Sequence, residues 1–106
     1  MTRITWDAAE NRMEFYGHAN YRARGMDLVC AGASMLMMTL VQAVEDRQDD
    51  FRPRIDMQDG HVAVQCEPKD QHRHDCALVM RTIYTGCRLL AEEYPQHVRA
   101  IKIQEG

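Results

Sequence analysis

Hydrophobic and polar residues alternate in five short stretches of the chain, and this alternation predicts five β-strands. The stretches are residues 2–6, 13–17, 54–58, 61–66 and 99–104. Successive side chains of a strand point to opposite faces, so the apolar set of each stretch should face a common core. We expect Ile4 and Trp6 of the first stretch, and Ile101 and Ile103 of the last, to lie in that core.

Two longer stretches have the spacing of helices. Residues 28–48 are apolar on nearly every side through Val44, which predicts a helix that other elements bury. A charge run at 45–50 and then Pro53 end this helix. Residues 72–94 carry apolar positions at intervals of three and four, typical of one buried helical face. These positions are Cys76, Val79, Met80, Ile83, Cys87, Leu90, Ala91 and Tyr94.

The order of the predicted elements defines the fold class. Asp59-Gly60 joins two alternating stretches, which is a strong hairpin signal. The order is therefore ββαββαβ, an α+β fold of two layers in which both helices cover one face of a mostly antiparallel sheet. At 106 residues, we expect residues 1–106 to form a single domain.

Composition limits the classes of function. An apolar fraction of 45% and a charged fraction of 27% are ordinary for a globular protein. A net charge of −3 argues against direct binding of nucleic acid, which needs a concentrated basic surface. The first residues hold no apolar signal segment, and we expect the later apolar stretch to be too short and interrupted to cross a bilayer. These features favour a cytoplasmic protein that contacts no membrane.

The candidate chemistry lies between the second strand and the first helix. Gly25 breaks the connecting loop, and Asp27 stands where a helix beginning at Leu28 would have its N-cap. Cys30 then falls in the first turn, where unpaired amides and the helix dipole favour a thiolate. His18 ends the preceding strand and could take the thiol proton. The amides around Cys30 could hold a developing oxyanion.

Ser34 follows Cys30 by one helical turn and lies on the same face. Its hydroxyl could approach the thiol or bond back to the helix carbonyls. Asp27 could likewise act as the N-cap or orient His18 as the third member of a triad. The residues alone leave both alternatives open.

The same string of residues resembles one family. Gly17-His18-Ala19, then Gly25-x-Asp27-Leu28-Val29-Cys30-Ala31, then Ser34 is similar to the signature of the ribosomal-processing cysteine protease Prp family. The resemblance implies that His18 and Cys30 are a catalytic dyad and that Asp27, Ser34, Gly17 and Gly25 support it. It also implies a bacterial cytosolic homodimer that removes the N-terminal extension of the large-subunit ribosomal protein numbered twenty-seven. Gly32 and Ala33 depart from the family, whose members more often carry alanine and valine there.

Two other functions compete with proteolysis. Cys66, His72, His74, Asp75 and Cys76 are zinc-ligand types, but their spacing matches no closed zinc site, so we expect neither a metal nor a cofactor. The domain could instead be a non-catalytic, peptide-binding or ribosome-associated module that adds an extended segment to a sheet edge. The reactivity of Cys30 separates these functions, because a binding module needs no reactive thiol.

Overall fold

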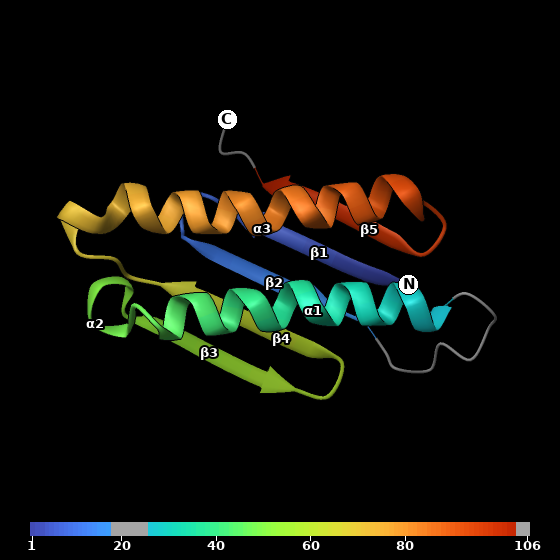
Figure 1. Cartoon of the computed structure of the whole chain (residues 1–106), viewed down its shortest axis with the longest axis horizontal. Helices are drawn as coiled ribbons and strands as arrows, with labels where there is room; N and C mark the ends of the chain where they lie inside the picture. Colours follow the sequence, from blue (N-terminus) through green and yellow to red (C-terminus); the bar gives the residue numbers. More distant parts are fainter. Residues whose placement is uncertain (18–25, 104–106) are drawn as a thin grey trace.

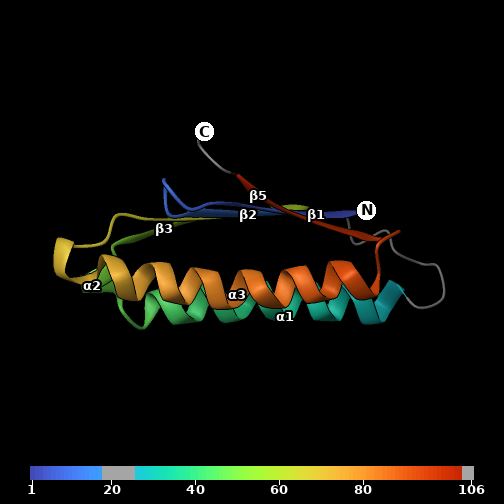
Figure 2. The same ribbon diagram turned by 90° about the horizontal axis from the view of Figure 1, so that it is seen from above.

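The computed structural model describes residues 1–17 and 26–103, with the backbone alone for Met26 and Asp27. Its elements form two layers, with the helices on one face of the sheet (Figures 1 and 2). In chain order they are β1 (Thr2–Asp7), β2 (Arg12–Tyr16), α1 (Met26–Glu45), α2 (Gln48–Phe51), β3 (Pro53–Gln58), β4 (His61–Cys66), the 3-10 turn η1 (Asp70–His72), α3 (Arg73–Glu93) and β5 (Val98–Ile103). The α+β class and the placement of the helices are as expected.

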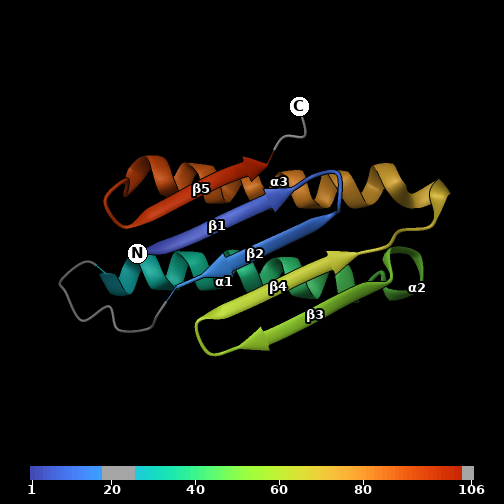
Figure 3. The ribbon, with the colours of Figure 1, turned by 180° about the vertical axis from the view of Figure 1, so that it is seen from behind.

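The five strands form one sheet in the order β3-β4-β2-β1-β5 (Figure 3). All neighbouring pairs are antiparallel except β1 and β5, which run parallel. The Asp59-Gly60 turn joins β3 to β4, and Gly60 takes a φ of 78°, a conformation that glycine adopts without strain. The mostly antiparallel sheet and its second hairpin are therefore confirmed.

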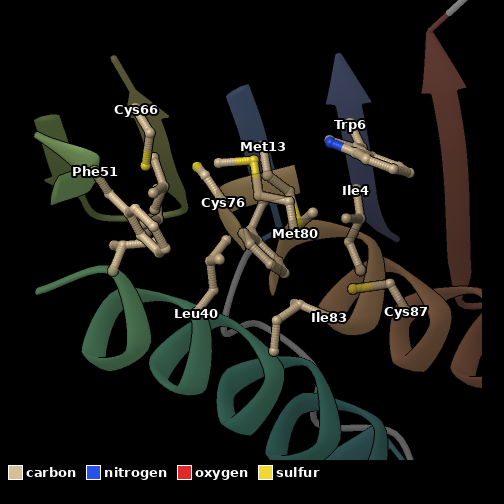
Figure 4. Packing of buried hydrophobic residues seen from close by; sticks show 14 of the residues in the cluster. Ile4, Trp6, Met13, Leu40, Phe51, Cys66, Cys76, Met80, Ile83 and Cys87 are labelled. Atoms are coloured by element: carbon tan, nitrogen blue, oxygen red, sulfur yellow. The ribbon is translucent and has the colours of Figure 1, made fainter. Parts of the chain in front are cut away.

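The core lies between the sheet and the helices (Figure 4). Ile4, Trp6, Met13 and Phe15 reach it from β1 and β2, as the alternation predicts. From α3 come Cys76, Met80, Ile83 and Cys87, which confirms the helical spacing. β1 and β2 thus turn every second side chain toward the helical layer.

The predicted facing of β5 is wrong by one residue. Val98 is buried and Ala100 packs against the core, whereas Ile101 and Ile103 are exposed on the opposite face of the sheet. The parallel pairing sets this register, because Val98 lies opposite the buried Thr2. β5 has apolar residues at both odd and even positions, so its sequence alone does not show which set faces the core.

α1 and α3 run side by side in opposite directions across the sheet (Figure 1). Two glycines lie at their contact. A Cβ placed on Gly32 would lie 3.3 Å from Leu90 Cδ1, and one placed on Gly86 would lie 2.5 Å from Leu36 Cδ2. The absence of a side chain at Gly86 therefore allows Leu36 to pack directly against the α3 backbone.

α1 is less buried than its composition predicts. Val29, Leu40 and Val44 are fully buried against the sheet, but Leu28, Met35 and Met38 are 65%, 61% and 55% exposed. The 18 residues Leu28–Glu45 are also long and apolar enough to span a membrane, contrary to our expectation, with a mean hydropathy of 1.6. Length and composition alone do not define a membrane span, because a core helix has the same properties. Here the inward side of α1 forms part of the core.

A short helix, α2, occupies the region where the sequence predicted only a helix end. Phe51 of α2 is fully buried, and the Arg47 guanidinium lies 4.7 Å from its ring centroid. Arg47 also donates to Asp50 (3.0 Å) and to Asp75 (3.2 Å) in the first turn of α3. The charged residues at 45–50, through Arg47, therefore connect α1, α2 and α3 by side-chain contacts and do not only end a helix.

Candidate active site

Four parts of the chain meet at one end of the domain and enclose a cleft. The end of β2, the β3–β4 turn and the first half of α1 lie together there, beside the start of β1 (Figures 1 and 3). The cleft has a volume of about 380 Å³, a size that suits a few side chains of a bound peptide. Its described lining consists of Thr2, Phe15, Tyr16, Gly17, Cys30, Ala33, Ser34, Met37 and Met57 to Val62.

Cys30 is half-buried and lines this cleft from α1. The described part of α1 starts at Met26, and Asp27 already has helical backbone there, so Asp27 is not the N-cap. Cys30 therefore lies more than one turn into the helix, counted from Met26. In a helix that starts at Met26, the amide of Cys30 bonds the carbonyl four residues before it. The unpaired amides belong to the first turn, which removes the Cys30 amide from the expected oxyanion donors.

The other three cysteines are fully or almost fully buried in the core. Contact with the Cys76 thiol, together with burial, raises the pKa of Cys66 far above its ordinary value. Burial raises the pKa of Cys87 to about 12. The hydrogen bond between the two thiols lowers the pKa of Cys76. All three side chains are buried out of reach of a substrate, so Cys30 is the cysteine with access to solvent.

The structure brings together three of the six predicted site residues. Cys30, Gly17 and Ser34 line the same cleft, and Ser34 is exposed one turn after Cys30. His18 and Gly25 lie outside the described residues, as does the side chain of Asp27. Gly17 is the last described residue before His18, and its amide donates to the carbonyl of Gly60 at 3.0 Å.

The sequence did not identify the residue pair that borders the cleft at the end of β2 and the start of β4. Tyr16 and His61 are paired across β2 and β4, and their rings stack with centroids 4.4 Å apart and an interplanar angle of 10°. Glu14, on the same face of β2, accepts a hydrogen bond from the Tyr16 hydroxyl. Glu14 and Tyr16 face away from the buried Met13 and Phe15, so the stacked rings lie on the sheet face opposite to the helices, while the strand ends that carry them border the cleft.

The residues considered for zinc do not form a site. Cys66 and Cys76 lie next to one another inside the core (Figure 4), while His74 is exposed on α3. His72 faces Asp50, with 3.3 Å between its Nε2 and Oδ1. Within residues 1–17 and 26–103, no three or more His, Cys, Asp or Glu side chains are grouped to hold a metal ion.

A half-buried cysteine beside a peptide-sized cleft, on a helix that covers a mostly antiparallel sheet, is an arrangement suited to a cysteine peptidase. The chain belongs to the cysteine protease Prp family, whose model matches residues 1–99. The class and the family are thus the ones that the Gly-His-Ala and Asp-x-x-Cys motifs indicated.

Known relatives agree over most of the chain. It is 29% identical over 83 residues to the ribosomal processing cysteine protease Prp of Staphylococcus aureus, across 78% of this chain and 77% of the relative. A crystal structure of the S. aureus protease with a covalently linked product peptide superposes with a TM-score of 0.78, at 25% identity, over 97% of this chain and 100% of that one. A Streptococcus mutans crystal structure gives 0.71 at 27% identity, covering 98% and 93% of the two chains.

Proposed function

We propose that this protein is an endopeptidase that removes the N-terminal extension of the large-subunit ribosomal protein numbered twenty-seven. The observation that carries the proposal is the position of Cys30, the accessible cysteine, in a peptide-sized cleft of a cysteine protease fold. The S. aureus relative is named for ribosomal processing, and its crystal structure holds a covalently linked product peptide. Both support a ribosomal protein segment as the substrate.

In the proposed reaction, Cys30 and His18 form the dyad. The Cys30 sulfur attacks the scissile carbonyl while His18 accepts the thiol proton, and His18 then returns that proton to the leaving amine. Water hydrolyses the thioester and regenerates the thiol. A His18→Ala variant should keep its fold and lose cleavage, and cleavage at the wild-type rate would exclude His18 as the base.

The substrate proposal is tested with the ribosomal protein itself. The wild-type protein is incubated with full-length ribosomal protein from the same genome, and the N-terminus of the product is sequenced. A single new N-terminus at the end of the extension is the expected result. Cuts elsewhere, or in a version that lacks the extension, would contradict the proposed substrate while leaving the peptidase class intact.

The alternative function is a non-catalytic module that binds the same segment. An exposed edge strand beside the cleft would serve either function, since β3 is an edge of the sheet and its residues Met57 and Gln58 line the cleft. Isothermal titration with the peptide separates the two. A binding module would hold the uncut peptide equally with wild-type protein and with Cys30→Ala, and wild-type protein would release no product.

We also propose that the protein is a homodimer and that the exposed apolar stripe of α1 forms its interface. The stripe consists of Leu28, Ala31, Met35 and Met38, at helical spacings of three and four. Three of these side chains are large and more than half exposed, which is unusual for a monomer surface. Sedimentation should give a dimer for wild-type protein and a monomer for Met38→Glu. A dimeric Met38→Glu variant would place the interface elsewhere.

The cytoplasm is the proposed location. The four cysteines all lie among the described residues, and none is in a disulfide, as in a reducing compartment. Fractionation of the host cell should recover the protein with the cytoplasmic enzymes. Recovery with the membranes would instead indicate that the apolar stripe of α1 contacts lipid.

A further inference from the structure

We propose that the face of the sheet opposite to the helices binds single-stranded RNA, through the arginine pair Arg3 and Arg99 and the stacked rings of Tyr16 and His61. This binding function is separate from proteolysis and does not depend on the proposed dyad. In the described part of the chain, all the helices lie on the other face of the sheet (Figure 2). The described elements therefore leave this face open to a partner.

One row of side chains crosses the open face from edge to edge. The register of the five strands places these residues opposite one another in the order Arg99, Arg3, Tyr16, His61 and Gln58. Neighbouring strands lie about 4.8 Å apart, so the row is about 19 Å long. Other open sheets bind single-stranded RNA in this way, with ring side chains that stack two or three bases.

Two arginines at one end of the row have no acidic partner among the described residues. Arg3 and Arg99 lie directly opposite each other on the parallel strands β1 and β5, and both are exposed. The ion pairs of the described residues include neither of them. Like charges at opposite positions destabilise a sheet. A phosphate between the two guanidinium groups would remove this repulsion, and its oxygens match the donor geometry of arginine.

The rings beside the arginine pair are already stacked. Tyr16 and His61 lie almost parallel with their centroids 4.4 Å apart, and the Arg3 guanidinium lies 4.9 Å from the centre of the Tyr16 ring. The Tyr16 hydroxyl donates to Glu14, which also pairs with Arg12. Bases of single-stranded RNA stack on aromatic rings and on guanidinium planes. The preformed stack therefore favours RNA over an acidic polypeptide, which has no bases.

The net charge of −3, from which we expected no binding of nucleic acid, is unevenly distributed between the two layers. The helices contain seven acidic residues and three arginines. The outward positions of the strands hold four arginines and three carboxylates, namely Arg3, Arg12, Arg54, Arg99, Asp7, Glu14 and Asp56. Glu14 is only 15% exposed and is neutralised by Arg12. The acidic excess therefore belongs to the helical layer, and the row itself contains no carboxylate.

The test measures the fluorescence anisotropy of a labelled single-stranded RNA of mixed sequence, about 12 nucleotides long, at salt concentrations of about 50 to 200 mM. The charge variant is Arg3→Gln with Arg99→Gln. Its matched control is Arg81→Gln with Arg88→Gln, which removes the same charge from exposed positions of α3. Tyr16→Leu removes a ring of the stack and leaves every charge in place. Circular dichroism shows that each variant is folded.

We expect the wild-type protein to bind the RNA with an affinity that falls as salt rises. The charge variant should weaken binding at about 50 mM salt by about tenfold or more, and the slope of log K against log salt should fall by about 1.4, because two phosphate contacts are lost. Tyr16→Leu should weaken binding by about fivefold or more and leave the slope unchanged. The α3 control should bind like the wild-type protein.

Three results would overturn the proposal. They are no binding by the wild-type protein at about 50 mM salt, equal weakening by the two double arginine variants, and unchanged affinity of Tyr16→Leu. Polyglutamate is added as a competitor, because it carries negative charge without bases. Displacement of the RNA by an equal concentration of polyglutamate charge would show that this face binds acidic polypeptides, and the assignment to RNA would be wrong. Cleavage by Cys30 is measured separately, and none of these results alters it.

Discussion

Replacing glycine by alanine should change the stability of the protein in opposite directions at Gly32 and at Gly86, the two glycines at the contact between α1 and α3. In either helix, replacing glycine by alanine gains about 0.8–1.0 kcal/mol of helix propensity. At Gly32, the new Cβ would lie 3.3 Å from the end of the Leu90 side chain, which can move by a few tenths of an ångström. Gly32→Ala should therefore stabilise the protein by about 0.5–1 kcal/mol.

At Gly86 the new Cβ would lie 2.5 Å from Leu36 Cδ2 and 3.7 Å from both Cγ and Cδ1, so the whole leucine side chain, packed against the core, would have to move. Overpacking of this kind costs about 1–3 kcal/mol, which outweighs the propensity gain by about 1 kcal/mol. The two variants should therefore differ by about 1.5–2 kcal/mol although the chemical change is identical. The difference measures packing alone, because the propensity gain cancels.

Urea unfolding followed by circular dichroism, at one protein concentration, measures both free energies of unfolding. A further variant, Gly86→Ala with Leu36→Ala, removes the contacted side chain, so alanine at 86 should no longer destabilise in that background. Equal stability of the two single variants would refute the described packing of α1 on α3.

Three other outcomes follow from the described contacts. Under native conditions, iodoacetamide should modify Cys30, and it should leave Cys66, Cys76 and Cys87 unmodified until the protein is unfolded. Peptide mapping by mass spectrometry measures this, and labelling of one of these three thiols in the folded protein would contradict their burial. A hydrogen bond from Arg47 holds the pKa of Asp50 below its ordinary 3.8, so the stability that this carboxylate contributes is full above that pH and is lost as the pH falls through the folded pKa. Asp50→Asn should therefore lose less stability than the wild-type protein on acidification below pH 4. Identical acid profiles of the two proteins would contradict this. Phe51→Ala should lower the free energy of unfolding by about 3–5 kcal/mol, because the ring is fully buried, and a loss below 1 kcal/mol would mean that α2 is not part of the core.

The elements that local chemistry determines could be predicted from the sequence. The Asp59-Gly60 turn fixed β4 at residues 61–66, because few other residue pairs adopt that turn. The spacing of Cys76, Met80, Ile83 and Cys87 fixed the buried face of α3 in the same way. Both signals depend on a few neighbouring residues and need no knowledge of the partner element.

Features that depend on an element far away in the sequence were mispredicted or missed. The facing of Ile101 and Ile103 was wrong because the pairing of β5 with β1, at the other end of the chain, sets it. The exposed side of α1 was missed because an apolar composition does not distinguish a side that faces the core from one that faces a partner.

The same distinction between local signals and distant partners applies to the candidate site. Cys30 was identified from a local motif, and the structure places it in the cleft with Gly17 and Ser34. The stack of Tyr16 on His61 was not foreseen, because it requires β2 and β4 to pair across the intervening α1, α2 and β3. The helical backbone at Met26 and Asp27 likewise changed which amides are available near the thiol.

The central claim is that Cys30 is the nucleophile of a peptidase. The most direct test is mass spectrometry of a peptide that spans the extension of the ribosomal protein, incubated with wild-type protein and with Cys30→Ala, both shown to be folded. We predict a single cut by the wild-type protein and an intact peptide with Cys30→Ala. Equal cleavage by both proteins would contradict the claim, as would an intact peptide in both samples together with a Cys30 thiol no more reactive than the buried three.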